Sequence, residues 1–265
     1  MRNQLLRMNM TNFVPHNLKG KTAVVTGASG GIGRAIALAL ASAGANVIVH
    51  ARAREREAND TADEIRGLGG KAEVILADLS DPSRHGELVD RAWNWNGDVD
   101  IWINNAGVDV LTGEMAGRSF ADKLEQLWQV DVAATIALSR AAGAKMKARG
   151  SGAILNMGWD RSACGMAGDS GEMFAAIKGA VAAFTLSLAR SLAPQVRVNC
   201  IAPGWIRTGW GETASDGWQK RAATESLMQR WGTPGDVARV ARFLVSPEAD
   251  FVNGQVIVVN GGLAG

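Results

Sequence analysis

Hydrophobic and polar positions alternate along this chain with two different periods. Short runs rich in β-branched and other apolar residues are separated by longer stretches in which apolar residues return every three or four positions. The first pattern is typical of buried strands and the second of amphipathic helices. The expected strands are Thr22–Thr26, Asn46–His50, Ala72–Ala77, Asp100–Asn104, Ala153–Asn156, Arg197–Cys200 and Gln255–Val259. The expected helices include Gly31–Ala43, Pro82–Trp95, Phe120–Ala148 and Gly171–Leu192.

The order of these elements predicts the fold class. Strands that alternate with helices form βαβ units, whose parallel sheet is covered by helices on both faces. We therefore expect a single α/β domain with a doubly wound sheet of seven strands. A chain of 265 residues is long enough to bury a large core, and no internal repeat or low-complexity linker divides it. In such a fold the ligand site lies at the carboxyl ends of the strands.

Residues 1–18 precede this pattern, and we expect the domain to occupy residues 19–265. The first 18 residues contain two arginines and no acidic residue, but they lack the continuous apolar segment of a secretory signal. A short organellar presequence and a loose N-terminal extension are the two remaining interpretations. We favour the loose extension.

Composition excludes several classes of partner. The chain has 28 basic and 26 acidic residues, a balance that predicts neither nucleic-acid nor anionic-membrane binding. No apolar run approaches the roughly 18 residues of a membrane span. Cys164 and Cys200 form no metal-binding motif, so we expect no metal site. Two cysteines without a disulfide framework suit a reducing compartment, and we expect a cytoplasmic location.

A glycine-rich loop follows the first expected strand. Thr22–Gly33 reads TAVVTGASGGIG and leads into an alanine-rich helical stretch. Glycines permit a tight turn and a close approach to a ligand, and the following helix N-terminus offers free N–H groups to a phosphate. A tight turn alone would also explain the glycines. The order of strand, loop and helix favours a phosphate-binding loop.

Four further motifs follow in order: the pair Asp78–Leu79, NNAG at Asn104–Gly107, RVNCIAPGWIRT at Arg197–Thr208, and GQVIVVNGG at Gly254–Gly262. Together with TGASGGIG they resemble the short-chain dehydrogenase/reductase family over Leu18–Gly262. The resemblance implies a Rossmann-type fold, a nicotinamide dinucleotide cofactor, a small-molecule substrate and a homodimer or homotetramer. The cofactor-binding residues that it implies are Gly27, Ser29, Gly31, Ile32, Gly33, Asp78, Leu79, Asn105, Ala106, Gly107, Lys178, Pro203, Gly204, Ile206 and Thr208.

The end of the second strand predicts which dinucleotide binds. An acidic residue there would hydrogen-bond the free ribose hydroxyls of NAD, whereas an arginine accommodates the 2′-phosphate of NADP. The segment reads NVIVHARARERE, with no acidic residue at the strand end and Arg52 in its place. A guanidinium matches phosphate geometry, so we expect NADP(H) rather than NAD(H). Arg54 is better explained as part of a solvated helix.

The catalytic positions depart from the family pattern, which the resemblance gives as asparagine, serine, tyrosine and lysine. This chain contains no tyrosine at all. Lys178 is retained, but Phe174 stands one helical turn before it, where the tyrosine is expected. Gly158 and Trp159 occupy the serine region, and Asp131 occupies the asparagine position. We therefore predict an atypical member that lacks the catalytic tyrosine and serine.

Asp131 and Lys178 resemble the pair that replaces the tyrosine in peroxisomal-type 2,4-dienoyl-CoA reductases. This likeness implies an NADP(H)-dependent oxidoreductase that reduces a conjugated C=C bond, in which Lys178 also anchors the nicotinamide ribose. Asp131 either takes part in catalysis or forms a structural ion pair, and Asp160 is either a further proton donor or a turn residue. Two alternatives remain open: a non-catalytic NADP(H)-binding scaffold or sensor, and a non-redox lyase or isomerase.

Residues 204–231 follow the proline-glycine loop and correspond to the family's substrate-covering lid. They are rich in tryptophan, whose flat apolar face suits an aromatic or apolar substrate. The expected pocket residues are Trp159, Phe174, Trp205 and Trp210. Packing within the lid or against a second subunit would explain the lid tryptophans equally well.

Overall fold

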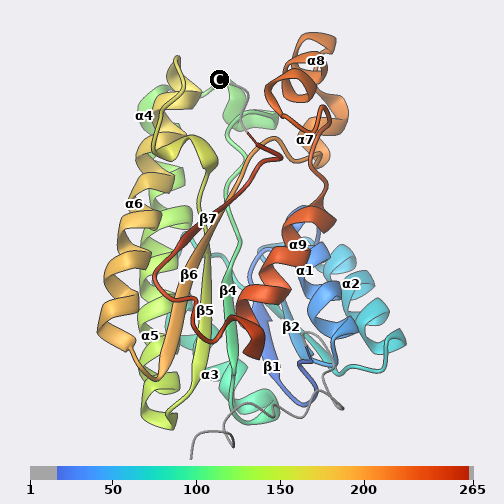
Figure 1. The fold of residues 1–265 in the computed structure, drawn as a ribbon, viewed down its shortest axis with the longest axis vertical. Coiled ribbons are helices and arrows are strands. Elements are labelled where there is room, and N and C mark those ends of the chain that lie inside the picture. Colours follow the sequence, from blue (N-terminus) through green and yellow to red (C-terminus); the bar gives the residue numbers. More distant parts are fainter. Residues whose placement is uncertain (1–16, 263–265) are drawn as a thin grey trace, which may run out of the picture.

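The computed structural model describes residues 17–262, apart from the side chains of Trp210 and Thr213. A seven-stranded, fully parallel sheet forms its middle layer, in the order β3-β2-β1-β4-β5-β6-β7 (Figure 1). The strands are β1 (Thr22–Val25), β2 (Asn46–Ala51), β3 (Ala72–Leu76), β4 (Ile101–Asn104), β5 (Gly152–Met157), β6 (Val196–Pro203) and β7 (Val256–Val259). The predicted doubly wound, Rossmann-type fold is confirmed.

Helices cover both faces of the sheet. The helices are α1 (Gly31–Ser42), α2 (Glu55–Gly67), α3 (Ser83–Asn96), α4 (Phe120–Leu127), α5 (Thr135–Arg149), α6 (Asp169–Leu192), α7 (Gly209–Thr213), α8 (Asp216–Glu225) and α9 (Pro234–Val245). One core cluster joins α1, α2 and α9 to the sheet, and a second joins α3, α5 and α6 to its other face. The inner strands β1 and β4 are buried at every position and mostly apolar, because helices cover both of their faces.

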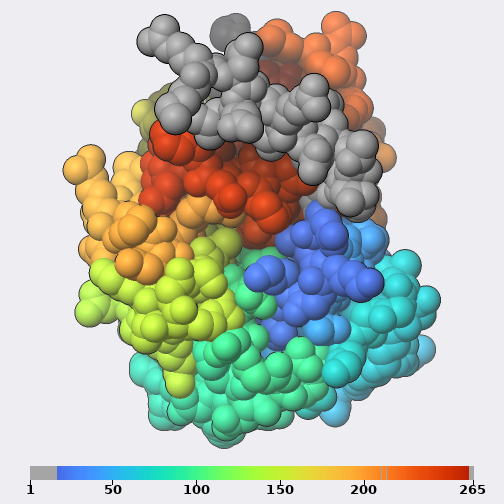
Figure 2. Space-filling view, turned by 60° about the horizontal axis from the view of Figure 1, so that its bottom comes forward, coloured from blue at the N-terminus to red at the C-terminus, as the bar shows by residue number. Residues whose placement is uncertain are grey.

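The strand order reverses beside β1. The chain runs outward from β1 through β2 to β3, then returns to place β4 on the other side of β1. Loops leaving β1 and β4 therefore part in opposite directions and open a crevice at their carboxyl ends, where doubly wound folds bind ligands. The lid helices α7 and α8 lie at this same end (Figure 1). Figure 2 brings forward the opposite end, where the strands begin.

The long helical stretch expected at Phe120–Ala148 is interrupted. A π-helical segment, Trp128–Ala134, joins α4 to α5. The expected boundaries were otherwise close. The solvated helix expected at Arg54 corresponds to α2, for which Arg54 is the N-cap, whereas α9 was not among the predicted helices. The exposed faces of α2 are highly charged. Its buried residues are only Ala58, Thr61, Ala62 and Ile65. Its apolar stripe is therefore narrow and hard to recognise.

The proposed boundary after residue 18 lies at the edge of the described chain. Residues 1–16 are outside the described residues, so their interpretation as an extension stays a prediction. Leu18 itself belongs to the core: it is 1% exposed and its N–H donates to the carbonyl of Ala43.

One helix of the described part of the chain, α6, is long and apolar enough to cross a membrane by length and composition. The sequence search for an uninterrupted apolar run did not single it out. In the fold α6 packs against β5, β6 and α5, and it carries the charged residues Glu172, Lys178 and Arg190. These contacts are those of a core helix in an α/β domain.

Candidate active site at the carboxyl ends of the strands

The glycine-rich loop between β1 and α1 has the backbone that a phosphate-binding loop needs. Gly27 and Gly31 have positive φ angles of 66° and 54°, which glycine adopts without strain. A Cβ on Gly33 would collide with the carbonyl oxygen of Gly27. No side chain caps the N-terminus of α1, so its first N–H groups remain available to an anion. The loop therefore fits the pyrophosphate of a dinucleotide.

The NNAG motif after β4 is fastened to this loop. The hydroxyl oxygen of Thr26 accepts hydrogen bonds from the backbone N–H groups of Asn105 at 2.9 Å and Ala106 at 3.0 Å. The side-chain amide of Asn105 donates to the carbonyl of Thr26. A Cβ on Gly27 would lie only 2.9 Å from the Cα of Ala106. Two motifs about 80 residues apart in sequence therefore form one surface.

His50, at the end of β2, also holds the glycine-rich loop and was not among the predicted site residues. Its Nδ1 accepts a hydrogen bond from the N–H of Gly27 at 3.3 Å, and its Nε2 lies 3.0 Å from the carbonyl of Ala77. Burial lowers the pKa of His50 to about 4. The ring is therefore neutral with its proton on Nε2, and it links the loop to the segment after β3.

Charged residues gather where the adenosine end of a dinucleotide is expected. Arg52 is exposed just after β2, close enough to Asp78 for its charge to help lower the pKa of that carboxyl. Burial opposes this shift, and hydrogen bonds from Ser80 contribute more to it than Arg52 does. Leu79 is buried in the core beside α3. The structure thus brings Arg52, Asp78 and Leu79 together, as the sequence predicted.

Lys178 and Asp131 form a buried ion pair. The Lys178 Nζ lies 2.8 Å from Asp131 Oδ2, and the two side chains are 13% and 3% exposed. Asp131 Oδ1 also accepts a hydrogen bond from the N–H of Val108 at 3.0 Å. A Cβ on Gly107 would lie 2.7 Å from Asp131 Oδ2, so the last residue of the NNAG motif leaves room for the carboxylate. The structure thus brings Lys178 of α6 and Asp131 of the segment Trp128–Ala134 together, and their catalytic role stays a prediction.

Trp159 and Phe174, which stand where the serine and the tyrosine are expected from the sequence, contact each other. The rings of Trp159 and Phe174 pack edge to face, with centroids 6.1 Å apart and an interplanar angle of 62°. Gly158 leaves no room for a side chain, because a Cβ there would lie 2.8 Å from the Cys200 Sγ. Burial raises the pKa of the Cys200 thiol to about 12, so this cysteine is no nucleophile. The centre is therefore walled by two aromatic rings.

Asp160 lies where the loops after β5, β6 and β7 meet. Its Oδ2 accepts a hydrogen bond from the side-chain amide of Asn260 at 3.1 Å, and a Cβ on Gly204 would lie 2.9 Å from the same oxygen. Burial raises the pKa of Asp160, although Asn260 and the charge of Arg161 oppose the shift. Asn260 was not predicted from the sequence, since it lies 100 residues from its partner.

The lid is fastened to the site loops through Glu225, the last residue of α8. The Glu225 carboxylate accepts hydrogen bonds from the Trp205 indole N–H at 2.7 Å and from Arg221 at 2.6 Å, and it pairs with Arg161. The Trp205 ring packs 5.2 Å from that of Trp218. Trp205 thus takes part in lid packing, the alternative that the sequence left open. The side chain of Trp210 lies outside the described residues.

The remaining predicted cofactor residues lie along the same edge. Pro203 ends β6, and Ile206 is buried beside α9. Thr208 is close to the glycine-rich loop, because a Cβ on Gly31 would lie 3.6 Å from its methyl group. Ser29 and Ile32 are half-buried in and after the loop. In the described part of the chain, no cluster of three or more histidine, cysteine or acidic residues could hold a metal.

Comparison with known proteins gives a consistent result. A family model described as Enoyl-(Acyl carrier protein) reductase matches residues 27–264. The 3-oxoacyl-(acyl-carrier-protein) reductase FabG of Vibrio cholerae serotype O1 is 35% identical over 253 residues, which cover 93% of this chain and 98% of the relative.

Two solved structures show the same fold with different dinucleotides. A 7 alpha-hydroxysteroid dehydrogenase complexed with NADH and 7-oxo glycochenodeoxycholic acid has a TM-score of 0.86 at 32% identity, covering 94% of this chain and 96% of that one. A short chain dehydrogenase from Burkholderia cenocepacia J2315 in complex with NADP has a TM-score of 0.84 at 33% identity, covering 93% and 98%. Likeness of this extent in both sequence and fold shows that the chain belongs to the short-chain dehydrogenase/reductase family and is an oxidoreductase of that type.

Proposed function

We propose that this oxidoreductase uses NADP(H) in an atypical active site that lacks the family's tyrosine and serine, and that it reduces a C=C bond of an apolar or aromatic substrate. The observation that carries the proposal is the buried Lys178–Asp131 ion pair, with Phe174 one helical turn before Lys178 and packed against Trp159. When bound, the cofactor supplies a hydride to the substrate. The protein has to orient both molecules and provide a proton.

The residues around the glycine-rich loop would hold the dinucleotide. The uncapped N-terminus of α1 would bind its pyrophosphate, and Asp78 with Leu79 would border the adenine. Lys178 would hydrogen-bond the nicotinamide ribose, with Asp131 fixing the position of its ammonium group. Arg52 would bind the 2′-phosphate that distinguishes NADP from NAD.

C=C reduction suits this site better than carbonyl reduction. In carbonyl reduction the family pattern uses a tyrosine hydroxyl to protonate the oxygen after hydride adds to the carbonyl carbon, and neither Trp159 nor Phe174 has a hydroxyl. Hydride addition to one carbon of a conjugated C=C bond leaves an enolate, which the positive charge of Lys178 can stabilise. A proton added to the other carbon completes the saturated product. The family description of an enoyl reductase supports this class of substrate.

Asp160 is the better candidate for the proton source. Asp131 is nearly inaccessible, and both of its oxygens are occupied by Lys178 and by the backbone of Val108. Asp160 is only partly buried, and its raised pKa favours the protonated form that a general acid needs. We therefore assign Asp131 to positioning and Asp160, directly or through water, to proton transfer.

The cofactor assignment is tested by calorimetric titration with NADPH and NADH. NADPH should bind more tightly, and Arg52→Ala should weaken its binding about ten-fold while leaving NADH unchanged, because a charge-assisted contact to phosphate is lost. Arg54→Ala is the matched control, since it removes an exposed arginine two positions away. Equal losses in both variants would contradict the role of Arg52.

The reaction is tested by following NADPH absorbance with α,β-unsaturated thioesters or ketones and with saturated ketones. Turnover of the unsaturated compounds, lost in Lys178→Ala and reduced in Asp160→Asn, supports the proposal. Turnover of saturated ketones at comparable rates would overturn it. Tight NADPH binding without transfer to any compound would indicate the scaffold or sensor, and product formation without an absorbance change would indicate a lyase or isomerase.

A homodimer or homotetramer in the cytoplasm completes the proposal. The edge strand β7 exposes Val256 and Val258, and Phe251 beside it is fully exposed, as expected of a surface that a second copy would cover. The exposed Cys164 and the buried Cys200 are both free thiols, which suits the proposed cytoplasmic location. Sedimentation analysis of the purified chain would test the assembly.

A further inference from the structure

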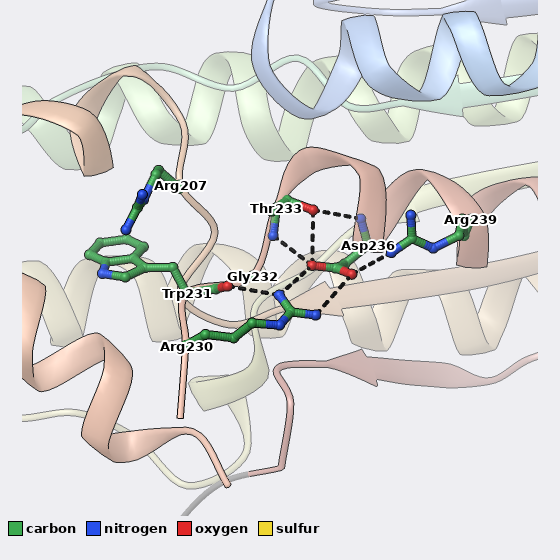
Figure 3. Close-up of a pocket in the computed structure, with 7 residues that line it drawn as sticks. All are labelled: Arg207, Arg230, Trp231, Gly232, Thr233, Asp236 and Arg239. Carbon is green, nitrogen blue, oxygen red and sulfur yellow. Dashed lines mark hydrogen bonds and ion pairs between the residues drawn. The ribbon is translucent and has the colours of Figure 1, made fainter. Parts of the chain in front are cut away.

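A pocket lined by arginines opens where the chain enters the lid and where it leaves it (Figure 3). It has a volume of about 480 Å³, and none of its residues belongs to the predicted site. Arg207 comes from the segment after β6, Arg230 from the segment before α9, and Arg239 from α9 itself. The other lining residues are Trp231, Gly232, Thr233 and Asp236.

The floor of this arginine pocket is held rigidly. The N–H of Arg207 donates to the carbonyl of Gly232 at 2.8 Å, and the N–H of Gly232 donates to that of Trp205 at 2.9 Å. A Cβ on Gly232 would lie 2.5 Å from the Ile206 Cδ1, so the two segments approach as closely as glycine allows. The indole of Trp231 is 5% exposed and packs against that of Trp205.

The pocket has more positive than negative charge. Asp236 is its one acidic lining residue, and its carboxylate accepts hydrogen bonds from Arg230 at 2.8 Å, from Arg239, and from the backbone and hydroxyl of Thr233. These contacts occupy both oxygens of Asp236. The Arg207 guanidinium forms no ion pair or side-chain hydrogen bond with a described residue, and it points toward the indole of Trp231 (Figure 3).

We propose that the arginine pocket binds a phosphate monoester or pyrophosphate group at a site separate from the glycine-rich loop. Three guanidiniums and one carboxylate leave two uncompensated positive charges, which repel each other until an anion binds between them. Each guanidinium offers five donors in a planar fork that matches phosphate oxygens, and most of these donors remain unused. An exposed site of this kind loses affinity as ionic strength rises.

The position of the pocket connects it to the cofactor site. Arg207 directly precedes Thr208, which lies against the glycine-rich loop. An anion that fixes Arg207 would therefore act on the segment that borders both the loop and the lid. By linkage, if the bound anion changes the affinity for NADPH by some factor, NADPH changes the affinity for the anion by the same factor.

Calorimetric titration of the full chain with inorganic pyrophosphate, at low ionic strength, tests this proposal. One pyrophosphate should bind per chain, both in the free protein and with saturating NADPH. Arg207→Gln and Arg239→Gln should each weaken binding about ten-fold, because each removes a charge-assisted contact. Arg190→Gln, which removes an exposed arginine from α6, should leave the affinity unchanged.

Three results would overturn the proposal. Absence of pyrophosphate binding would show that the excess positive charge of the arginine pocket does not create an anion-binding site. Complete loss of binding in the presence of NADPH would place the anion in the cofactor site. Equal weakening by all three substitutions would show that pyrophosphate responds only to the net charge of the protein. Arg207 is suited to this test because, within the described part of the chain, its side chain forms no ion pair whose loss would disturb folding.

Discussion

Lys178 and Asp131 depend on each other, because each neutralises a charge that would otherwise be buried alone. Removing one partner of a buried ion pair costs much more than removing both. Lys178→Met should therefore lower the free energy of unfolding by about 3 kcal/mol, and the double variant Lys178→Met/Asp131→Asn should recover most of that loss. Urea denaturation of the single and double variants measures the difference.

The control for this prediction is the ion pair between Lys145 and Asp90, whose side chains are 42% and 67% exposed. Lys145→Met should change the free energy of unfolding by less than about 1 kcal/mol. If Lys178→Met lowers the free energy of unfolding no more than Lys145→Met does, the Lys178–Asp131 pair does not behave as a buried ion pair.

Trp159 and Phe174 also act as a pair, and replacing both tests the proposal that the site lacks a serine and a tyrosine hydroxyl. The double variant Trp159→Ser/Phe174→Tyr places two hydroxyls where the family has them, next to the retained Lys178. It should gain NADPH-dependent reduction of a saturated ketone at least about ten-fold above the unmodified chain, the low end of what a positioned general acid supplies. Trp159→Ala/Phe174→Ala, which removes the rings without adding hydroxyls, should show no gain.

Residues that interact along one helix or one motif were predictable, whereas those joined only by the fold were not. Phe174 and Lys178 are four residues apart, so their shared face follows from the helical repeat. Asp160 and Asn260 come together because β5 and β7 flank the same strand of a parallel sheet, and local sequence carries no signal of that contact. His50 resembles any buried strand residue until its partners at Gly27 and Ala77 are known.

Among the elements, the lid depends most on one side chain. Glu225→Ala removes the acceptor shared by Trp205, Arg161 and Arg221, so α8 should open more readily. Amide hydrogen exchange in residues 216–225 should accelerate about ten-fold, the value for one lost hydrogen bond to a charged group. Glu212→Ala, at an exposed position in α7, is the control. Equal exchange in both variants would show that Glu225 does not hold the lid.

Helices and strands were predictable where their buried residues recur with one consistent pattern along the sequence. The seven strands were located within a few residues because parallel strands are apolar on both faces. The helix α2 was expected only as a solvated helix around Arg54, without bounds, because its charged positions hide a narrow apolar stripe. The interruption at Trp128–Ala134 has no signature in composition, since it is a change of helical phase rather than of residue type.

The stability of the whole molecule should depend on pH through His50. Its pKa is about 4 in the folded chain and 6.5 ordinarily, so between these values the unfolded chain binds a proton that the folded chain does not. The free energy of unfolding should be at its full value above pH 6.5 and fall with pH through this window, by at most about 3 kcal/mol. His50→Gln should show a shallower slope when thermal unfolding is followed from pH 6.5 to 4.5.

The raised pKa of Asp160 opposes the effect of His50, because the folded chain takes up that proton before the unfolded chain does. Carboxyls with lowered pKa values act in a lower range of pH. Asp78 and Glu225 have lowered pKa values, so their stabilising charges are lost only as the solution becomes more acidic than their ordinary titration range. An unchanged slope in His50→Gln between pH 6.5 and 4.5 would therefore show that the histidine is not held neutral by the fold.

The π-helical segment Trp128–Ala134 makes chain length, as well as the identity of Asp131, a constrained property of this part of the protein. A π turn contains one residue more than an α turn, and each residue of an α-helix advances the side chains by about 100°. Deleting one residue there would turn α4 about its axis relative to α5 and carry Leu127 away from Ile177 on α6. Many substitutions in this helix are compatible with the fold, but deleting a single codon would shift the α4 part of the helix relative to the α5 part. Insertions and deletions should therefore be rarer here over evolutionary time than in the lid.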